Sequence, residues 1–432
     1  MKHFYPSDLS KFVVAHWPAL EAGEDLPNAA VLETLISTCY QASLLRQENV
    51  PVVFRLIVIE PEDLPEEGGP PLGLHRLEFA RNLEFNALEL RRLSSAASFS
   101  RTLIGVRIDP NNGPEIWGLV HSGPRWLHAI HGGRGSAAPL PARLAISVTG
   151  PGHLDVARGR EVIGHLEEGK VFGPSMNLFQ AEWLQEWFAS IRQERIEIHK
   201  EARKDAGENW AELEPDLTRV IGQHMMRRLI AGMRAFQHGG TLVVVPPEMA
   251  DLFCGENPYL SIKYGFRAGE PRARFRTLII NVMSTLAKIA GDQHSVIGWR
   301  DYQKTTNADI IKLDEAIFEM SHLVSALSTV DGAVVLTRRF ELLGFGAEIH
   351  CESTELNFVA KALDLEGEHS VIESVHAVGT RHRSAYRICN ALKDVLSIIL
   401  SQDGNVQFAR WKDDNVMYWD QQAAFNFSSS IY

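Results

Sequence analysis

Cysteine, long apolar runs and excess positive charge are all scarce in this sequence. The chain has 432 residues and four cysteines at wide, irregular spacings, which excludes a disulfide framework and a cysteine-paired metal site. No apolar run reaches the roughly 18 residues that a membrane-spanning helix needs, and the first residues contain no apolar signal region. A formal net charge of −11 argues against broad nucleic-acid or anionic-membrane binding. We therefore expect a cytoplasmic protein with no nucleic-acid partner and no membrane partner.

The composition is that of an ordinary globular protein, with 45% hydrophobic and 22% charged residues. The length exceeds that of one typical domain and suggests two or three. We predict an α/β (α+β) fold in three parts: a separate α/β N-terminal domain over 1–175, a helical connector over 176–212, and a C-terminal domain over 213–422 with a mixed β-sheet flanked by helices.

Hydrophobic periodicity places elements within these parts. The sequence predicts helices at 28–45, 177–205, 213–237, 273–290 and 307–327, a buried strand at 52–60, short strands at 102–108, 115–121, 125–130, 143–149, 153–157 and 161–166, an apolar strand at 241–245, a strand at 340–350, a hairpin at 395–410 and a last strand at 415–419.

Three local features have ordinary interpretations. The charges of 192–204 alternate in sign, which is typical of a solvated connecting helix. Residues 144–158 resemble 396–410, which indicates either a diverged duplication or two unrelated hairpins. His121, His128 and His131 lack a partner at a recognised metal-ligand spacing, so we interpret them as surface or core histidines.

The most informative stretch is Gly379-Thr380-Arg381-His382-Arg383-Ser384-Ala385, which leads into an amphipathic run. It predicts a helix with Thr380 as its cap and three basic residues in its first turn. Cations are normally disfavoured at this end of a helix, where free N–H groups and the dipole already attract anions. The pattern therefore indicates a site for a multiply charged anion such as a triphosphate, gripped by arginine forks.

A second stretch, Asp331-Gly332-Ala333, precedes an apolar run and reads as a strand with one carboxylate and two very small residues. Gly and Ala permit a ligand to approach the backbone closely. We expect Asp331 to be a buried-edge carboxylate suited to holding a divalent cation or to accepting a proton from a hydroxyl.

Together these two stretches resemble the diadenylate cyclase (DisA-type) family. Its paired DGA and GTRHRAA motifs are matched with one change, Ser384 in place of Ala. The resemblance covers roughly residues 213 to 420. It implies a nucleotidyltransferase that condenses two ATP molecules into cyclic di-AMP, with Mg²⁺ or Mn²⁺ as the cofactor.

The resemblance also implies roles for individual residues. Asp331 takes the catalytic carboxylate role beside the metal and the ribose 3′-hydroxyl. Gly332 and Ala333 let the nucleotide lie against the strand. The phosphates would be held by Thr380, Arg381, His382 and Arg383, with His382 also near the metal.

Two further segments complete the predicted site. Ser401 opens a hairpin turn near the triphosphate, and Asp403 is a candidate metal neighbour, although Gln402 departs from the acidic residue found in relatives. Phe345, Gly346 and Ala347 form either an adenine wall or simply a bent strand that needs its glycines.

One site holds one ATP, so the resemblance implies that two protomers meet face to face for catalysis. The N-terminal part resembles the sensor-type domains that are fused to such cyclases. The long spacing from Asp331 to Thr380 predicts an inserted loop around 351–373 that gates the site. Two other functions stay open: a catalytically silent nucleotide-binding sensor, and a cyclase that makes a different cyclic nucleotide.

Overall fold

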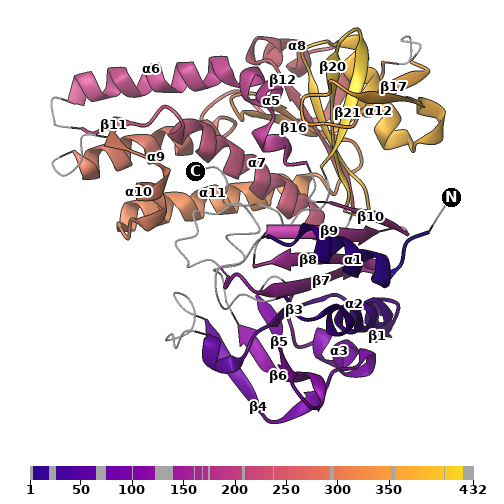
Figure 1. Ribbon diagram of the computed structural model, residues 1–432. Coiled ribbons are helices and arrows are strands. Elements are labelled where there is room, and N and C mark those ends of the chain that lie inside the picture. The colour runs from indigo at the N-terminus through magenta and orange to yellow at the C-terminus, as the bar shows by residue number, and fades with distance from the viewer. Residues whose placement is uncertain are drawn as a thin grey trace. The chain divides into compact units, whose positions relative to one another are not determined.

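The computed structural model describes residues 3–18, 26–64, 74–99, 101–121, 140–159, 161–167, 169–173, 176–206, 210–236, 238–291, 296–351, 356–402 and 404–421. Contacts divide them into two compact units, one from residues 3–173 and one from 176–421 (Figure 1). Each unit holds a large mixed sheet with helices, which confirms the predicted fold class. No described helix is long and apolar enough to cross a membrane. The predicted strand at 125–130, with His128 and His131, falls outside the described residues.

The first unit is built on an eight-stranded sheet in the order β10-β9-β8-β7-β3-β5-β6-β4, in which only β3 and β5 pair in parallel. Its elements are α1 (Pro6–His16), α2 (Ala29–Ser43), β1 (Arg46–Gln47), β2 (Val50–Pro51), β3 (Phe54–Val58), the 3₁₀ turn Pro61–Asp63, β4 (His75–Glu84), α3 (Ala87–Ser94), β5 (Thr102–Asp109), β6 (Gly113–His121), β7 (Leu144–Gly150), β8 (His153–Arg158), β9 (Glu161–Glu167) and β10 (Lys170–Phe172).

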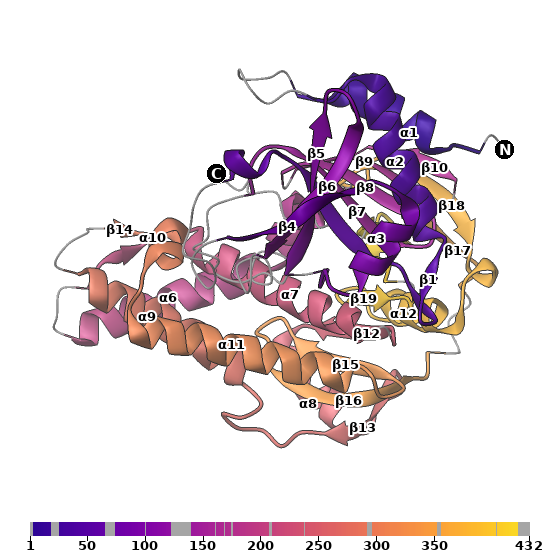
Figure 2. The same cartoon turned by 90° about the horizontal axis from the view of Figure 1, so that it is seen from below.

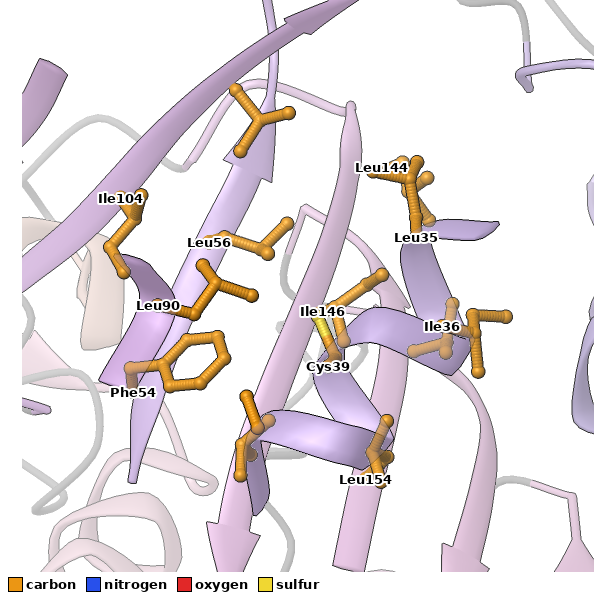
Figure 3. Close-up of a cluster of buried hydrophobic side chains, with 14 of the residues drawn as sticks. Leu35, Ile36, Cys39, Phe54, Leu56, Leu90, Ile104, Leu144, Ile146 and Leu154 are labelled. Atoms are coloured by element: carbon orange, nitrogen blue, oxygen red, sulfur yellow. The ribbon is translucent and has the colours of Figure 1, made fainter. Parts of the chain in front are cut away.

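The core of this unit lies between α2, α3 and the sheet (Figure 3). Asn28 caps α2 by accepting a hydrogen bond from the Val31 N–H, which starts the helix where the periodicity predicts it. The buried stripe of α2, including Leu35 and Cys39, then packs on strand residues such as Ile146. The apolar period of α2 therefore anchors the unit.

The second unit contains a nine-stranded sheet in the order β13-β16-β15-β12-β19-β20-β21-β17-β18. Its elements are the 3₁₀ turn Leu178–Gln180, α5 (Glu182–Trp187), α6 (Ala189–Ala206), β11 (Glu212–Leu213), α7 (Leu217–Ala235), β12 (Gly240–Val245), the 3₁₀ turn Pro247–Met249, α8 (Ala250–Cys254), β13 (Leu260–Gly265), α9 (Arg274–Ala290), β14 (Val296–Ile297), α10 (Trp299–Lys304), α11 (Ala308–Leu327), β15 (Ala333–Thr337), β16 (Leu342–Ile349), β17 (Phe358–Ala362), β18 (Ser370–Ser374), the 3₁₀ turn Val375–Ala377, α12 (Thr380–Ala391), β19 (Leu396–Leu400), β20 (Val406–Lys412) and β21 (Asn415–Gln421).

The two faces of this sheet carry different helices. Ala385 and Ile388 of α12 share one buried cluster with Val243 of β12 and Ala409 of β20. Because side chains alternate along a strand, the neighbouring Phe408 faces the other side, towards α7. Helices α7, α9 and α11 run beside one another in both views (Figures 1 and 2).

The segment before α6 is fastened to the last strand of the same unit. The Leu178 N–H donates to Oε1 of Gln421 at 2.8 Å. The ring of Trp183 stacks on that of Trp419 with centroids 4.5 Å apart, and its Nε1–H donates to the Leu365 carbonyl at 2.9 Å. Residues 178–187 are therefore an integral part of this unit. The domain boundaries expected from the sequence stay predictions.

Three expectations about this unit were wrong. The predicted single helix over 177–205 is broken into a 3₁₀ turn, α5 and α6, because Ala181 takes an extended conformation that starts α5 afresh. Nor is α6 a solvated helix, since Arg195 and His199 on it are buried. The predicted loop over 351–373 contains the antiparallel pair β17–β18. Residues 144–158 and 396–410 both form antiparallel hairpins, which either interpretation of their similarity expects.

Candidate active site

The first turn of helix α12, with Arg381, His382 and Arg383, forms a basic tip at one end of the strands of the nine-stranded sheet. Gly379 is the residue that precedes the helix, and no side chain caps it. The prediction that Thr380 is the cap was wrong: Thr380 is the first helical residue, and its Oγ1 accepts a hydrogen bond from Nη2 of Arg383 at 3.2 Å. The first turn has no acidic residue, so its N–H groups and cations are left to attract an anion.

The far side of α12 fixes the helix to the sheet. Cys389 is fully buried, and its Sγ lies 3.2 Å from the Ala409 carbonyl and 3.3 Å from Oγ of Ser397. Burial raises the pKa of this thiol to about 12, so it stays protonated and serves packing rather than nucleophilic chemistry.

The Asp331-Gly332-Ala333 stretch lies at the start of β15. The strand itself begins at Ala333, so Asp331 and Gly332 precede it instead of lying within it. Both are exposed, so the expectation of a buried-edge carboxylate was wrong. Gly332 has φ +110°, and a Cβ there would lie 2.6 Å from the carbonyl carbon of Gly346 and 2.8 Å from the nitrogen of Ala347. The glycine is required, because it seats Asp331 against β16.

Replacing Gly332 by Ala tests this requirement. We expect Gly332→Ala to destabilise the second unit by about 3 kcal/mol, because backbone strain and a backbone clash combine. Gly404→Ala is the matched control: its φ is also positive, at +87°, but its nearest neighbour would be 3.6 Å away. It should cost about 1 kcal/mol. Urea unfolding measures both values, and equal losses would contradict the close approach at Gly332.

Arg381 reaches across the end of the neighbouring strands. Its Nη1 lies 2.6 Å from the position that a Cβ on Gly239 would take. The Leu400 carbonyl oxygen and the Gln402 nitrogen lie 2.8 and 3.2 Å from the same point. The guanidinium is therefore held where β12 begins and β19 ends, beside Ser401.

The strand register places these groups at one end of the sheet. Thr241 of β12 pairs with Ala333 of β15, and Gly240 pairs with Leu400 of β19. One residue beyond the Gly240–Leu400 pair, this register sets Gly239 between Asp331 and Ser401. The three residues therefore lie in a row at the ends of β15, β12 and β19. At about 4.8 Å per strand, the backbones of the DGA stretch and of the hairpin turn lie about 10 Å apart. Both predicted halves of the site thus lie at the same end of the sheet.

The hairpin turn after β19 contains Ser401. Its Oγ accepts a hydrogen bond from the Asn405 N–H at 3.0 Å, so the side chain caps its own turn and keeps its O–H free to donate. Arg234 of α7 lies against the same turn, with Nε 3.6 Å from the position of a Cβ on Gly404. Sequence reasoning missed Arg234, because only the fold brings it here. Asp403 lies outside the described residues.

The predicted adenine wall, Phe345 to Ala347, lies on β16. Gly346 has φ +63°, consistent with a bent strand. Phe345 stacks on Tyr264 of β13 with ring centroids 4.7 Å apart, and a Cβ on Gly346 would lie 3.2 Å from the Tyr264 ring. Tyr264 is 44% exposed, so its ring offers an open aromatic surface beside the wall. The only feature of the sequence that could have indicated Tyr264 was an aromatic residue in a short strand.

A polar network extends behind the tip of α12. The Tyr386 hydroxyl donates to Oε1 of Gln407 at 2.9 Å, and Nε2 of Gln407 donates to Oδ1 of Asp420 at 2.8 Å. Nζ of Lys361 lies 2.7 Å from the other Asp420 oxygen. The network connects α12 to β17, β20 and β21. Sequence reasoning did not find it.

His382 lies between this network and the basic tip. Burial and, after it, the charge of Arg381 lower the pKa of His382, while Asp420 opposes them. The imidazole is therefore neutral at pH 7, a form in which it can accept or donate one hydrogen bond or act as a ligand. Its ring centroid lies 6.3 Å from that of Tyr386.

The described residues contain no group of three or more histidine, cysteine, aspartate or glutamate side chains that could hold a metal ion by themselves. A site with so few protein ligands suits Mg²⁺ or Mn²⁺ only where substrate phosphates supply the other ligands. Mg²⁺ is commonly held in this way, by one or two carboxylates plus phosphates. The exposed Asp331 fits such a site.

Residues 21–121 match the family described as probable sensor domain DACNV. No curated protein matches the chain, and no solved structure does. The match lies within the predicted N-terminal sensor domain, and no cyclase domain is identified by it.

Proposed function

We propose that the second unit is a diadenylate cyclase, which condenses two ATP molecules into cyclic di-AMP and releases two molecules of pyrophosphate. The observation that carries this proposal is that Asp331 and Arg381 lie at the same end of one sheet. These residues belong to stretches that resemble the DGA and TRHR motifs of that family. The DACNV match gives independent support, because its name associates that sensor with diadenylate cyclases.

The arrangement of charges suits the reaction. The 3′-oxygen of one ATP attacks the α-phosphorus of the other, the bond to the leaving pyrophosphate breaks, and the hydroxyl proton must go to a base. Asp331 is the accessible carboxylate for that proton or for the cation. Arg381 and Arg383 lie where forks could stabilise negative charge on the phosphates, and Arg234 adds a third guanidinium at the turn.

A divalent cation, Mg²⁺ or Mn²⁺, completes the proposal. When bound, it would neutralise the triphosphate. Asp331 is the residue that we assign to it, with His382 and Asp403 as the other ligands expected from the sequence. The neutral imidazole of His382 suits either a ligand role or an N–H donated to a phosphate oxygen.

Cyclisation requires two such sites to face each other, because each nucleotide is attacked by the other. We propose that two copies of the chain associate through the end of the sheet that carries Asp331 and Arg381, and that the N-terminal sensor domain controls this association. Turnover per protomer should therefore rise with protein concentration until pairing is complete.

Incubation with ATP and Mg²⁺ or Mn²⁺ tests the proposal, with mass spectrometry of products from mixed nucleotides. Cyclic di-AMP as the main product supports it. Binding of ATP without product at high protein concentration would indicate a silent sensor instead. A product containing another base would identify a cyclase of different specificity.

The open ring of Tyr264 leads to a prediction about substrate binding. Stacking of a base on an aromatic side chain contributes about 1–3 kcal/mol, so Tyr264→Ala should raise KM for ATP roughly tenfold with a small change in kcat. Tyr264→Phe is the matched control and should keep KM within about twofold. Steady-state kinetics measures both variants, and an unchanged KM in Tyr264→Ala would remove this ring from the site.

A further inference from the structure

A small, partly open cavity lies on the face of the nine-stranded sheet opposite α12, among α5, α6, α7 and strands β19 and β20. Its volume is about 40 Å³, enough for about three water molecules. Most of its wall is apolar and includes Leu184, Phe188, Met226, Phe340 and Leu396. All of these side chains belong to the second unit.

Three polar groups line this apolar space and lack hydrogen-bond partners among the described residues. Arg195 is 4% exposed, and its Nε and Nη2 are unpaired. Thr218 is 1% exposed, and its Oγ1 is unpaired. Gln223 donates through Nε2 to the Phe179 carbonyl at 2.7 Å, which leaves its Oε1 without a partner. Buried polar atoms are nearly always satisfied, so the Arg195 and Thr218 donors call for an acceptor, and the Gln223 oxygen calls for a donor such as an ordered water.

Arg195 keeps its charge in this setting. Burial lowers its pKa to about 10, which still leaves it protonated at neutral pH. The adjacent Glu194 does not neutralise it by direct pairing, because its two oxygens bind Arg276 at 2.8 Å and Arg339 at 2.7 Å. Buried guanidinium N–H groups without an acceptor are costly, so an anion that accepts from Nε and Nη2 would remove a real penalty.

The orientation of Arg195 selects the shape of that anion. Its guanidinium lies over the Phe340 ring at 5.6 Å, so one face is already covered. The unpaired Nε and Nη2 are neighbours on one edge of the plane, which is the fork that grips a carboxylate with two parallel hydrogen bonds. Gly222 of α7 leaves room here, since a Cβ on it would lie 3.5 Å from Nη1.

We propose that this cavity binds a small monocarboxylate of two or three carbons. Nε and Nη2 of Arg195 donate to its two oxygens, the Thr218 hydroxyl adds a third polar contact, and the short alkyl part packs against the apolar wall. The proposal rests on the cavity and its unpaired donors, and it is independent of whether the second unit is a cyclase.

The test uses the full chain with sodium acetate or sodium propionate, compared with sodium chloride at equal ionic strength. We expect a saturable rise of the melting temperature with each carboxylate, and line broadening of ¹³C-labelled acetate on addition of the protein. A rise of equal size with chloride, or no saturation, would overturn the proposal.

Variants locate the binding. Arg195→Met removes the fork while keeping the volume, and should abolish the saturable shift and the line broadening. Gly222→Ala places a methyl group in the cavity, and should weaken propionate binding at least tenfold. Arg274→Met is the control, because it removes an arginine that pairs with Glu270 and does not line the cavity, and should leave the affinity unchanged. Carboxylate binding that persists in Arg195→Met would contradict the assignment, and urea unfolding verifies that each variant is folded.

Discussion

Asp331→Asn should lower the rate of cyclic di-AMP formation by at least 10³-fold while the protein stays folded. The substitution removes the only carboxylate of the DGA stretch, and with it both a proton acceptor and an oxygen ligand for the cation, two contributions that each reach several powers of ten. Because Asp331 is exposed, the free energy of unfolding should change by less than about 0.5 kcal/mol. Product formation is measured by mass spectrometry and stability by urea unfolding.

The matched control for this variant is Glu348→Gln. Glu348 is also an exposed carboxylate and lies on β16, directly after the predicted adenine wall. Its loss should leave turnover within about twofold of the unchanged protein. Substantial product from Asp331→Asn at normal stability would refute the role given to Asp331, and a similar loss in both variants would point to general charge at the edge instead.

Arg381→Lys should lower turnover by about 10²- to 10³-fold, the second largest effect that we expect. Lysine keeps the charge but lacks the planar fork that binds two phosphate oxygens at once. Removal of one preorganised donor at a developing negative charge typically has this magnitude. Arg387→Lys, nearly two turns further along α12, is the control and should be nearly neutral. Single-turnover kinetics with ATP separates the chemical step from binding.

Gly239→Ala tests the position of Arg381 without touching its chemistry. The new Cβ would lie 2.6 Å from Nη1 of Arg381 and 2.8 Å from the Leu400 carbonyl oxygen, so the guanidinium must move. We expect a loss of turnover of the same order as in Arg381→Lys. Gly269→Ala carries comparable backbone strain, with φ +146° and its nearest neighbour at 3.7 Å, and should retain activity. Full turnover by a folded Gly239→Ala protein would show that the position of this guanidinium is unimportant.

The sequence was most informative where the relevant residues are neighbours in the chain. The stripe of Ala385 and Ile388 predicted α12. The small residues around Asp331 predicted the close approach of a ligand, whereas the neighbour that approaches Gly332 in the structure is the backbone of β16. The caps and strand limits were less predictable. Thr380 is helical because Gly379 already supplies the extended residue, and Asp331 is exposed because the strand starts two residues later.

Groups that meet only through the fold could not be predicted. Gly239 and Arg234 are far in sequence from Arg381 and from the turn after β19. Strand pairing places Gly239 there, and helix α7 carries Arg234 to the same turn. Arg195 belongs to a stretch of alternating charge, a pattern typical of exposed helices, yet tertiary packing buries it. Burial of a charged residue depends on what covers it, and a single sequence does not contain that information. The roles assigned to the site residues stay predictions.

The hydrogen bond between Leu178 and Gln421 has a consequence for folding during synthesis. The two residues are 243 positions apart, so the contact forms only after the last strand has been synthesised. Until then Trp183 lacks the ring of Trp419, and the Leu178 N–H lacks its acceptor on Gln421. A growing polypeptide of this kind completes the unit late, because its most distant segments must close the loop together. Chains held on ribosomes that stall before codon 419 should therefore be cut by proteases within residues 178–187 more readily than the finished protein.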